Sequence, residues 1–151
     1  MTSGHSSPTS PDPTSIAVGQ AIPSLVVEMT ATRIVAGAIA SRDFMPVHHD
    51  KAFAEMQGAP DIFPNILSDT AYCSRFLTDW AGPDAMVSRL NIRLGVPVFP
   101  GHTLTFTGSV TAVTQEGHEV VVDIGFVAKG DIGDHVTGTA TVRLPGDITA
   151  T

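Results

Sequence analysis

The fold of this chain is organised around residues 65–83, which read NILSDTAYCSRFLTDWAGP. Asn65 is a favourable N-cap, and Ala81-Gly82-Pro83 end the helical pattern. Apolar or small residues occupy positions 66, 67, 71, 72, 73, 76, 77 and 80. This pattern predicts a helix from Ile66 to about Trp80 with much of its circumference buried. We expect such a helix to lie inside the fold rather than along its edge.

The segment after this helix changes to the two-residue period of a β-strand. Alternating apolar and polar residues predict strands over residues 86–94, 103–112 and 136–144, and residues 119–127 read as a more continuously apolar strand. A first strand is expected over residues 21–29. Short links rich in glycine join the later strands, which predicts an antiparallel sheet with one buried and one polar face.

These elements predict an α+β fold. The economical packing is a curved antiparallel sheet wrapped around the long central helix. A sheet covered by a single helix still has an outer face and edges to protect, so we expect the protein to dimerise.

The residues that precede the helix are less regular. Residues 30–41 are apolar and ambiguous, and we favour a helix or turn there. Residues 50–58 predict a short helix that ends at Gly58. Residues 1–15 are rich in Ser, Thr, Pro and Gly, and are interpreted as a flexible tail ahead of one domain over residues 16–151.

Composition excludes several classes of function. Fifteen acidic and eight basic residues give a formal net charge of −7, and no basic cluster is present, which argues against a nucleic-acid partner. No apolar run has the length of a membrane span and the N-terminus lacks signal-peptide features, so we expect a cytoplasmic protein with no membrane contact. The one cysteine, Cys73, is interpreted as a buried structural residue.

Residues 42–50, which read RDFMPVHHD, gather acids and imidazoles beside a proline. Asp43 and His48 could activate water together, although Asp43 alone is equally consistent with a helix cap. Asp50 is interpreted as a cap and His49 as a surface or interface residue. Adjacent histidines project differently and no third ligand is evident, so no metal is expected.

Several blocks of the chain resemble the MaoC-like hydratases of the hot-dog fold. The family's motif, approximately Asp-x-Asn-Pro-hydrophobic-His-x-Asp, stands here as residues 43–50, DFMPVHHD. The family's Pro-Gly entry to its central helix is Pro64-Asn65, and residues 95–104, GVPVFPGHTL, resemble its strand entry. The resemblance covers about residues 22–144. Within the family it is strongest to the small catalytic subunit of actinobacterial steroid side-chain enoyl-CoA hydratases.

This resemblance implies hydration of a 2-enoyl-CoA thioester, with no cofactor. Asp43 and His48 would hold and activate the water that adds to the β-carbon. The backbone N–H groups of Asn65 and Ile66 would bind the thioester oxygen as it gains negative charge. Phe63 and Met45 are the expected acyl contacts.

Two positions depart from the family pattern. Met45 replaces the motif's Asn, and Asn65 replaces the helix-entry Gly, where its side chain could itself donate to the substrate. Together the two departures suggest a site reshaped for an unusual acyl group, and the resemblance to the steroid-type subunit implies a bulky, steroid-derived one.

The resemblance also implies an assembly and leaves alternatives open. The expected assembly is a homodimer or a heterotetramer with a second, diverged MaoC-like subunit that completes the acyl pocket. One alternative is that this chain is a non-catalytic scaffold subunit. Another is that it is a hot-dog acyl-CoA thioesterase, since both reactions occur on the same fold.

The remaining polar and aromatic residues receive structural interpretations. Arg89 and Arg93 share a strand face and could meet CoA phosphates, a partner or solvent. Trp80 is expected in the core or an interface. No function is assigned to the histidines at turns or strand starts, which are His102, His118 and His135.

Overall fold

The computed structural model describes residues 10–146 of the chain. Its helices are η1 (Pro13–Ser15), α1 (Ala31–Ala40), η2 (Pro46–His48), α2 (Lys51–Met56) and α3 (Ile66–Ala81), where η marks a 3-10 helix. Its strands are β1 (Ala21–Glu28), β2 (Met86–Leu94), β3 (Thr103–Glu116), β4 (Glu119–Gly130) and β5 (Gly133–Pro145).

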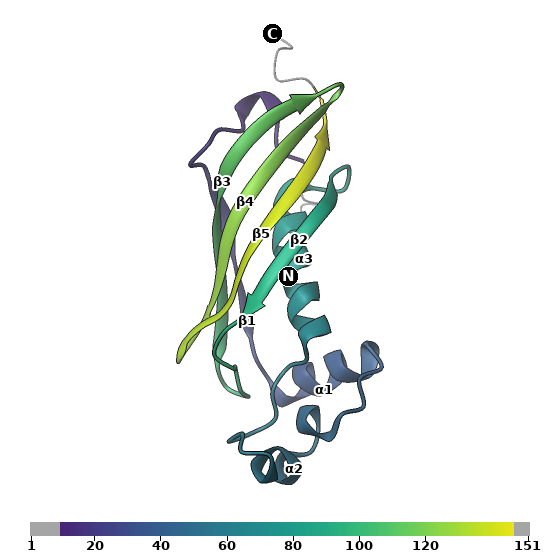
Figure 1. The fold of residues 1–151 in the computed structure, drawn as a ribbon, viewed down its shortest axis with the longest axis vertical. Helices are drawn as coiled ribbons and strands as arrows, with labels where there is room; N and C mark the ends of the chain where they lie inside the picture. The colour runs from purple at the N-terminus through teal and green to yellow at the C-terminus, as the bar shows by residue number, and fades with distance from the viewer. Residues whose placement is uncertain (1–9, 147–151) are drawn as a thin grey trace, which may run out of the picture.

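The strands form one antiparallel sheet in the order β1-β3-β4-β5-β2. The sheet is strongly curved, and α3 runs along the inner side of the curve (Figure 1). The predicted α+β architecture, a curved antiparallel sheet around a long central helix, is confirmed. Because β1 and β2 are the edge strands, each has one row of backbone groups that faces no neighbouring strand within residues 10–146.

The core lies between α3 and the sheet. Phe76 of α3 packs against Phe106 and Phe126, with ring centroids 5.9 and 6.0 Å away. Cys73 is fully buried on the same helix face, as predicted, and burial raises the pKa of its thiol to about 12. A thiol with that pKa is protonated at neutral pH, which is the state of a structural cysteine.

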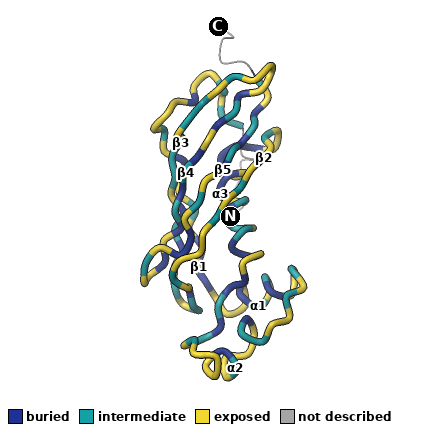
Figure 2. The backbone as a smooth tube through the Cα atoms, viewed as in Figure 1, coloured by how far each residue is buried: buried dark blue, intermediate teal, exposed yellow. Residues whose placement is uncertain are grey.

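One prediction for α3 is wrong. Three of the residues predicted to be buried are not, since Ile66 and Leu67 are each 54% exposed and Ala71 is also exposed. A single sheet covers one side of a helix, so the buried residues form one stripe, visible as the dark face of α3 in Figure 2. That stripe consists of Ser68, Asp69, Cys73, Phe76, Leu77, Trp80 and Ala81.

The two helices expected before α3 are both present. Thr30 caps α1 by accepting from the Arg33 N–H at 3.2 Å, and Asp50 caps α2 by accepting from the Phe53 N–H at 3.1 Å. A small apolar cluster holds this part of the chain together, and it contains Ile34, Ala54 and Ile62. The segment that carries Asp43 and His48 therefore sits between two capped helices, beside the start of α3 (Figure 1).

The expected tail over residues 1–15 falls partly outside the described residues, which begin at residue 10. Within the described part, η1 is capped by Asp12, whose side chain accepts from the Thr14 N–H at 3.0 Å. Regular structure therefore starts ahead of residue 16. Within residues 10–146, helices are too short or too polar to cross a membrane.

Candidate active site

The position of Asp43 is set by the end of α1. Arg42 has a left-handed backbone, with a φ of 57°, which non-glycine residues seldom adopt. This conformation lets the Asp43 N–H donate to the Ala38 carbonyl at 2.9 Å, so the chain folds back on the helix that it leaves. The Asp43 side chain is thereby turned toward η2 and α3, where its partners lie.

His48 is held from the loop that enters α3. Its Nδ1 lies 2.7 Å from the Phe63 carbonyl oxygen, and its ring meets the Phe63 ring edge-on at 5.2 Å. A carbonyl can only accept, so Nδ1 carries the hydrogen and the neutral ring presents a lone pair at Nε2. The residue is 7% exposed. Its tautomer and its orientation are both fixed by the backbone.

The Nε2 lone pair points to Asp43. The distance from His48 Nε2 to Asp43 Oδ2 is 3.4 Å. Donation from the Asn65 amide is the main cause that lowers the pKa of Asp43, the Met45 N–H adds to it, and the nearby His48 contributes less. Asp43 is therefore ionised at neutral pH. Two acceptors that converge in this way suit a water molecule that donates one hydrogen to each.

Asn65 connects this pair to α3. Its Nδ2 donates to Asp43 Oδ2 at 2.9 Å and to Ser41 Oγ at 2.7 Å. Its Oδ1 accepts from the Ser68 N–H at 2.9 Å, as the predicted N-cap of α3, and from Ser68 Oγ at 2.6 Å. The expectation that this side chain could donate to a substrate is therefore wrong, because both amide hydrogens are already used.

The start of α3 supplies backbone donors beside the dyad. The first N–H groups of a helix have no carbonyl partner within it and carry partial positive charge. The Ser68 N–H donates to the Asn65 side chain, and the Asp69 N–H donates to the Asn65 carbonyl at 3.1 Å. The Ile66 N–H, at the first helical position, is thus suited to an oxyanion.

The other predicted site residues fall in different places. Phe63 is half-buried against His48, whereas Met45 is 49% exposed and gives only its backbone N–H to Asp43, at 3.2 Å. His49 is exposed and its Nε2 lies 3.2 Å from the Phe44 carbonyl oxygen. Asp50 is the α2 cap, as predicted. Four predicted residues are therefore brought together: Asp43, His48, Phe63 and Asn65.

Sequence reasoning missed a second carboxylate–imidazole pair. His135 Nε2 lies 3.0 Å from Asp69 Oδ1, and His135 Nδ1 lies 2.7 Å from the Val96 carbonyl oxygen. Both side chains are buried, with Asp69 1% and His135 4% exposed. The partners are 66 residues apart, so no local pattern could have indicated the pair. Ser41 and Ser68 were missed for the same reason, since their role depends on contact with Asn65.

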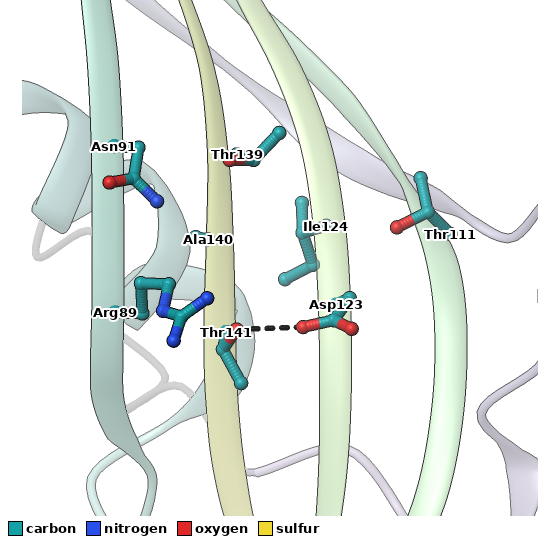
Figure 3. A pocket seen from close by; sticks show the side chains of 8 residues that line it. All are labelled: Arg89, Asn91, Thr111, Asp123, Ile124, Thr139, Ala140 and Thr141. Atoms are coloured by element: carbon teal, nitrogen blue, oxygen red, sulfur yellow. Dashed lines mark hydrogen bonds between the residues drawn. The ribbon is translucent and has the colours of Figure 1, made fainter.

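The described residues contain a further hollow and no metal-binding cluster. Within residues 10–146, no group of three or more His, Cys, Asp or Glu side chains is arranged to hold a metal ion. A hollow of about 290 Å³ lies on the sheet face away from α3, lined by Arg89, Asn91 and the threonines of Figure 3. Its one bond between lining side chains joins Thr141 to Asp123, at 2.7 Å. Asp43 and His48 do not line this hollow, so it is separate from the candidate active site.

A curved five-stranded antiparallel sheet with a long helix on its inner side is a hot-dog fold. The family described as MaoC like domain matches residues 15–130. This chain therefore belongs to the MaoC-like family, and the resemblance inferred from its motifs is confirmed.

Three known proteins are similar to this chain in sequence or structure. Over 127 residues the chain is 43% identical to the 3-oxo-4,17-pregnadiene-20-carboxyl-CoA hydratase beta subunit of Mycobacterium tuberculosis, covering 84% of this chain and 95% of that one. The crystal structure of the ChsH1-ChsH2 complex from that organism matches with a TM-score of 0.80, at 43% identity over 85% of this chain and 98% of the other. The (R)-hydratase from A. caviae involved in PHA biosynthesis matches with a TM-score of 0.78, at 27% identity, over 87% of this chain and 98% of the other.

Proposed function

We propose that this chain is the catalytic subunit of an enoyl-CoA hydratase that acts on a bulky, steroid side-chain 2-enoyl-CoA. The observation that carries the proposal is the 3.4 Å approach of His48 Nε2 to Asp43 Oδ2. A scaffold subunit would have no need of an imidazole whose tautomer is fixed by Phe63 and whose lone pair faces an ionised carboxylate.

In the proposed reaction, the dyad holds one water through both of its hydrogens. His48 Nε2 takes a proton from the water, and Asp43 orients the water and stabilises the imidazolium that forms. The water oxygen bonds to the β-carbon, and the π electron pair moves toward the α-carbon and the thioester oxygen. The proton held by the dyad is then delivered to the α-carbon, which leaves the residues in their starting states.

The negative charge that develops on the thioester oxygen needs a donor. The N–H groups of Asn65 and Ile66 at the start of α3 are the proposed donors, because they are fixed before substrate binds and lie at the positive end of the helix dipole. Loss of such a donor typically costs on the order of 3 kcal/mol of transition-state stabilisation.

The substrate class and the partner rest on the relatives. The M. tuberculosis protein is named for a steroid side-chain CoA thioester and is a beta subunit, and the matched crystal structure is a two-protein complex. We infer that this chain likewise works with a second MaoC-like subunit. Phe63 and the exposed Met45, with a flexible thioether, are the proposed contacts to the acyl group near the dyad.

The test is hydration of 3-oxo-4,17-pregnadiene-20-carboxyl-CoA by the chain co-purified with its partner subunit. Asp43→Asn and His48→Ala are each expected to lower kcat by about 10²- to 10⁴-fold, the usual contribution of a positioned acid–base group. The Asp50→Asn variant, in which Asn replaces Asp as the cap of α2, is the control and should retain wild-type activity. Near-normal rates in both dyad variants would reject a catalytic role for this chain and favour the alternative that it is a non-catalytic scaffold subunit.

A thioesterase is separated from a hydratase by its products. Hydrolysis releases free CoA thiol, whereas hydration adds water and keeps the thioester intact. A thiol reagent in the same assay therefore distinguishes the two activities. Rapid release of free CoA thiol that depends on Asp43 and His48 would reject the hydratase proposal and show that the chain is a thioesterase.

A further inference from the structure

The side-chain amide of Asn65 has all of its hydrogen-bonding capacity in use within the protein. The residue is 2% exposed, and the four bonds to Ser41, Asp43 and Ser68 range from 2.6 to 2.9 Å. The orientation of the amide is unambiguous, because the Asp43 carboxylate only accepts and the Ser68 N–H only donates. Nδ2 must therefore face Asp43, and Oδ1 must face α3.

These bonds join three separate parts of the site. Ser41 follows the last residue of α1, Asp43 carries the carboxylate of the dyad, and Ser68 lies in the first turn of α3. Asn65 is thus the side chain through which the position of the carboxylate depends on the helix that offers the proposed oxyanion donors. A cap alone would need only the bond to the Ser68 N–H.

We propose that Asn65 is a positioning residue for the reaction: its amide fixes Asp43 Oδ2 relative to His48 Nε2 and to the start of α3. This inference rests on the proposed function, but concerns a group that does not touch the substrate. Met45 occupies the motif position where the family carries an Asn, so in this chain the amide beside the catalytic carboxylate comes from the helix entry instead.

Few titratable groups surround this amide. Asp43 accepts from it and His48 lies on the far side of that contact, 3.4 Å from Asp43, while the serines at positions 41 and 68 do not titrate in the working pH range. Asp69, the next acid along α3, is bonded to His135. Replacing the amide by a carboxylate at position 65 would therefore set two acids against each other, and such a pair retains one proton to a higher pH than either acid alone.

Asn65→Asp separates positioning from capping. Asp is as good an N-cap as Asn, so the bond to the Ser68 N–H and the stability of α3 should be retained. At pH 7.5 the new carboxylate would repel Asp43, and kcat should fall at least about 10-fold, the size expected for loss of a hydrogen bond to a charged group. At pH 5.5 a shared proton restores a donor toward Asp43. The ratio of wild-type to variant kcat should then shrink at least about fivefold, with KM little changed.

The experiment uses the complex with its partner subunit and 3-oxo-4,17-pregnadiene-20-carboxyl-CoA, with thermal unfolding recorded for each variant. Asp50→Asn is the matched control, since it exchanges the same two residue types at the α2 cap without touching Asp43. Asn65→Ser is the second variant: it keeps an oxygen for the cap but lacks the amide, and its kcat should fall equally at both pH values.

The outcomes are separable. Wild-type kcat at pH 7.5 in Asn65→Asp or in Asn65→Ser would overturn the role of Asn65, while loss of activity in Asp43→Asn would still uphold the hydratase proposal. A ratio of wild-type to Asn65→Asp kcat that stays the same from pH 7.5 to 5.5 would also overturn it. If Asn65→Asp unfolds, the kcat of Asn65→Ser decides alone. Full activity of the dyad variants would instead reject the proposed function itself.

Discussion

Two Asp–His pairs in this chain differ in what their histidines can do. The Nδ1 of His48 is hydrogen-bonded to the Phe63 carbonyl. Its Nε2 lies 3.4 Å from Asp43 Oδ2, beyond a close hydrogen bond, so the Nε2 lone pair can accept a proton from a water. His135 lies within hydrogen-bond distance of an acceptor at both nitrogens, 2.7 Å from the Val96 carbonyl oxygen and 3.0 Å from Asp69 Oδ1, and its pKa is raised, so this site favours the protonated ring. The same two residue types therefore give a proposed acid–base pair beside the start of α3, where Asp43 is partly exposed, and a buried hydrogen-bonded pair between α3 and β5.

The buried pair should make stability depend on pH. Burial acts to lower the pKa of His135, but the bonds to Asp69 and to the Val96 carbonyl outweigh it, so the pKa is raised above its ordinary 6.5. A histidine with a raised pKa stabilises the folded state fully below its unfolded pKa, and this stabilisation is lost as pH rises through the folded pKa. We expect the free energy of unfolding to fall as the pH increases above about 6.5.

Urea denaturation of wild type and His135→Gln across pH 5.5–9 measures this dependence. Gln cannot be charged, so the variant should be less stable at low pH, and the difference between the two proteins should narrow as the pH rises. Two stability profiles that run parallel would mean that the pKa of His135 is the same in the folded and unfolded states, which would contradict this prediction.

At the scale of elements, glycines make room for an aromatic ring in the sheet. Gly108 and Gly138 are the register partners of Phe126 on the neighbouring strands. A Cβ at Gly138 would overlap the Phe126 ring, whereas a Cβ at Gly125 would meet only the Thr111 methyl at 3.4 Å. The ring that packs against Phe76 thus lies in space that a side chain at 138 would otherwise fill.

Gly138→Ala is expected to destabilise the protein by about 1–3 kcal/mol, the usual cost of overpacking a core. Gly125→Ala, on the adjacent strand, is the matched control and should change stability by less than about 1 kcal/mol. Urea midpoints at constant slope measure both. Equal midpoints for the two variants would mean that the Phe126 ring moves aside without cost.

The two sides of α3 should also respond differently to truncation. Leu77 is fully buried against the sheet, whereas Leu67 is 54% exposed. In the isolated chain, Leu77→Ala should cost about 2–5 kcal/mol and Leu67→Ala less than about 1 kcal/mol. Urea denaturation of the monomeric chain measures both variants. A loss of stability in Leu67→Ala as large as that in Leu77→Ala would contradict the exposed position of Leu67.

At the scale of the whole molecule, the site is open in a single chain. Four apolar side chains close in sequence to site residues are between 49 and 65% exposed: Phe44 and Met45 follow Asp43, and Ile66 and Leu67 follow Asn65. Apolar side chains at this density beside a site are typical of a ligand or partner surface. This exposure is consistent with an assembly like the complex that the M. tuberculosis relative forms.

Activity should therefore depend on a second subunit. Titrating this chain with the partner MaoC-like subunit is expected to raise kcat/KM for 3-oxo-4,17-pregnadiene-20-carboxyl-CoA until it saturates, because we propose that the partner completes the acyl pocket. Crotonyl-CoA, with little acyl surface to bury, should respond less, and light scattering should show the complex. A chain fully active by itself on the steroid thioester would contradict this expectation.

Local signals in the amino-acid sequence were enough to predict the helices, the strands and the family. The apolar period of residues 66–80, the alternation of the later strands and the cap residues Asn65 and Asp50 are local signals, and each predicted its element because backbone geometry fixes those periods. The motif around Asp43 and His48 indicated the proposed dyad before any geometry was known.

Which side chains contact one another became evident from the packing of the helices against the sheet. The tertiary structure joined Asn65 to Asp43 across 22 residues and Asp69 to His135 across 66, and it left Ile66 and Leu67 exposed where the sequence pattern predicted burial. The physical reason is that a hydrogen bond between distant residues depends on how helices and sheet pack, and local periodicity carries no information about that packing. Burial likewise depends on what covers a face, and one curved sheet covers only one side of a helix.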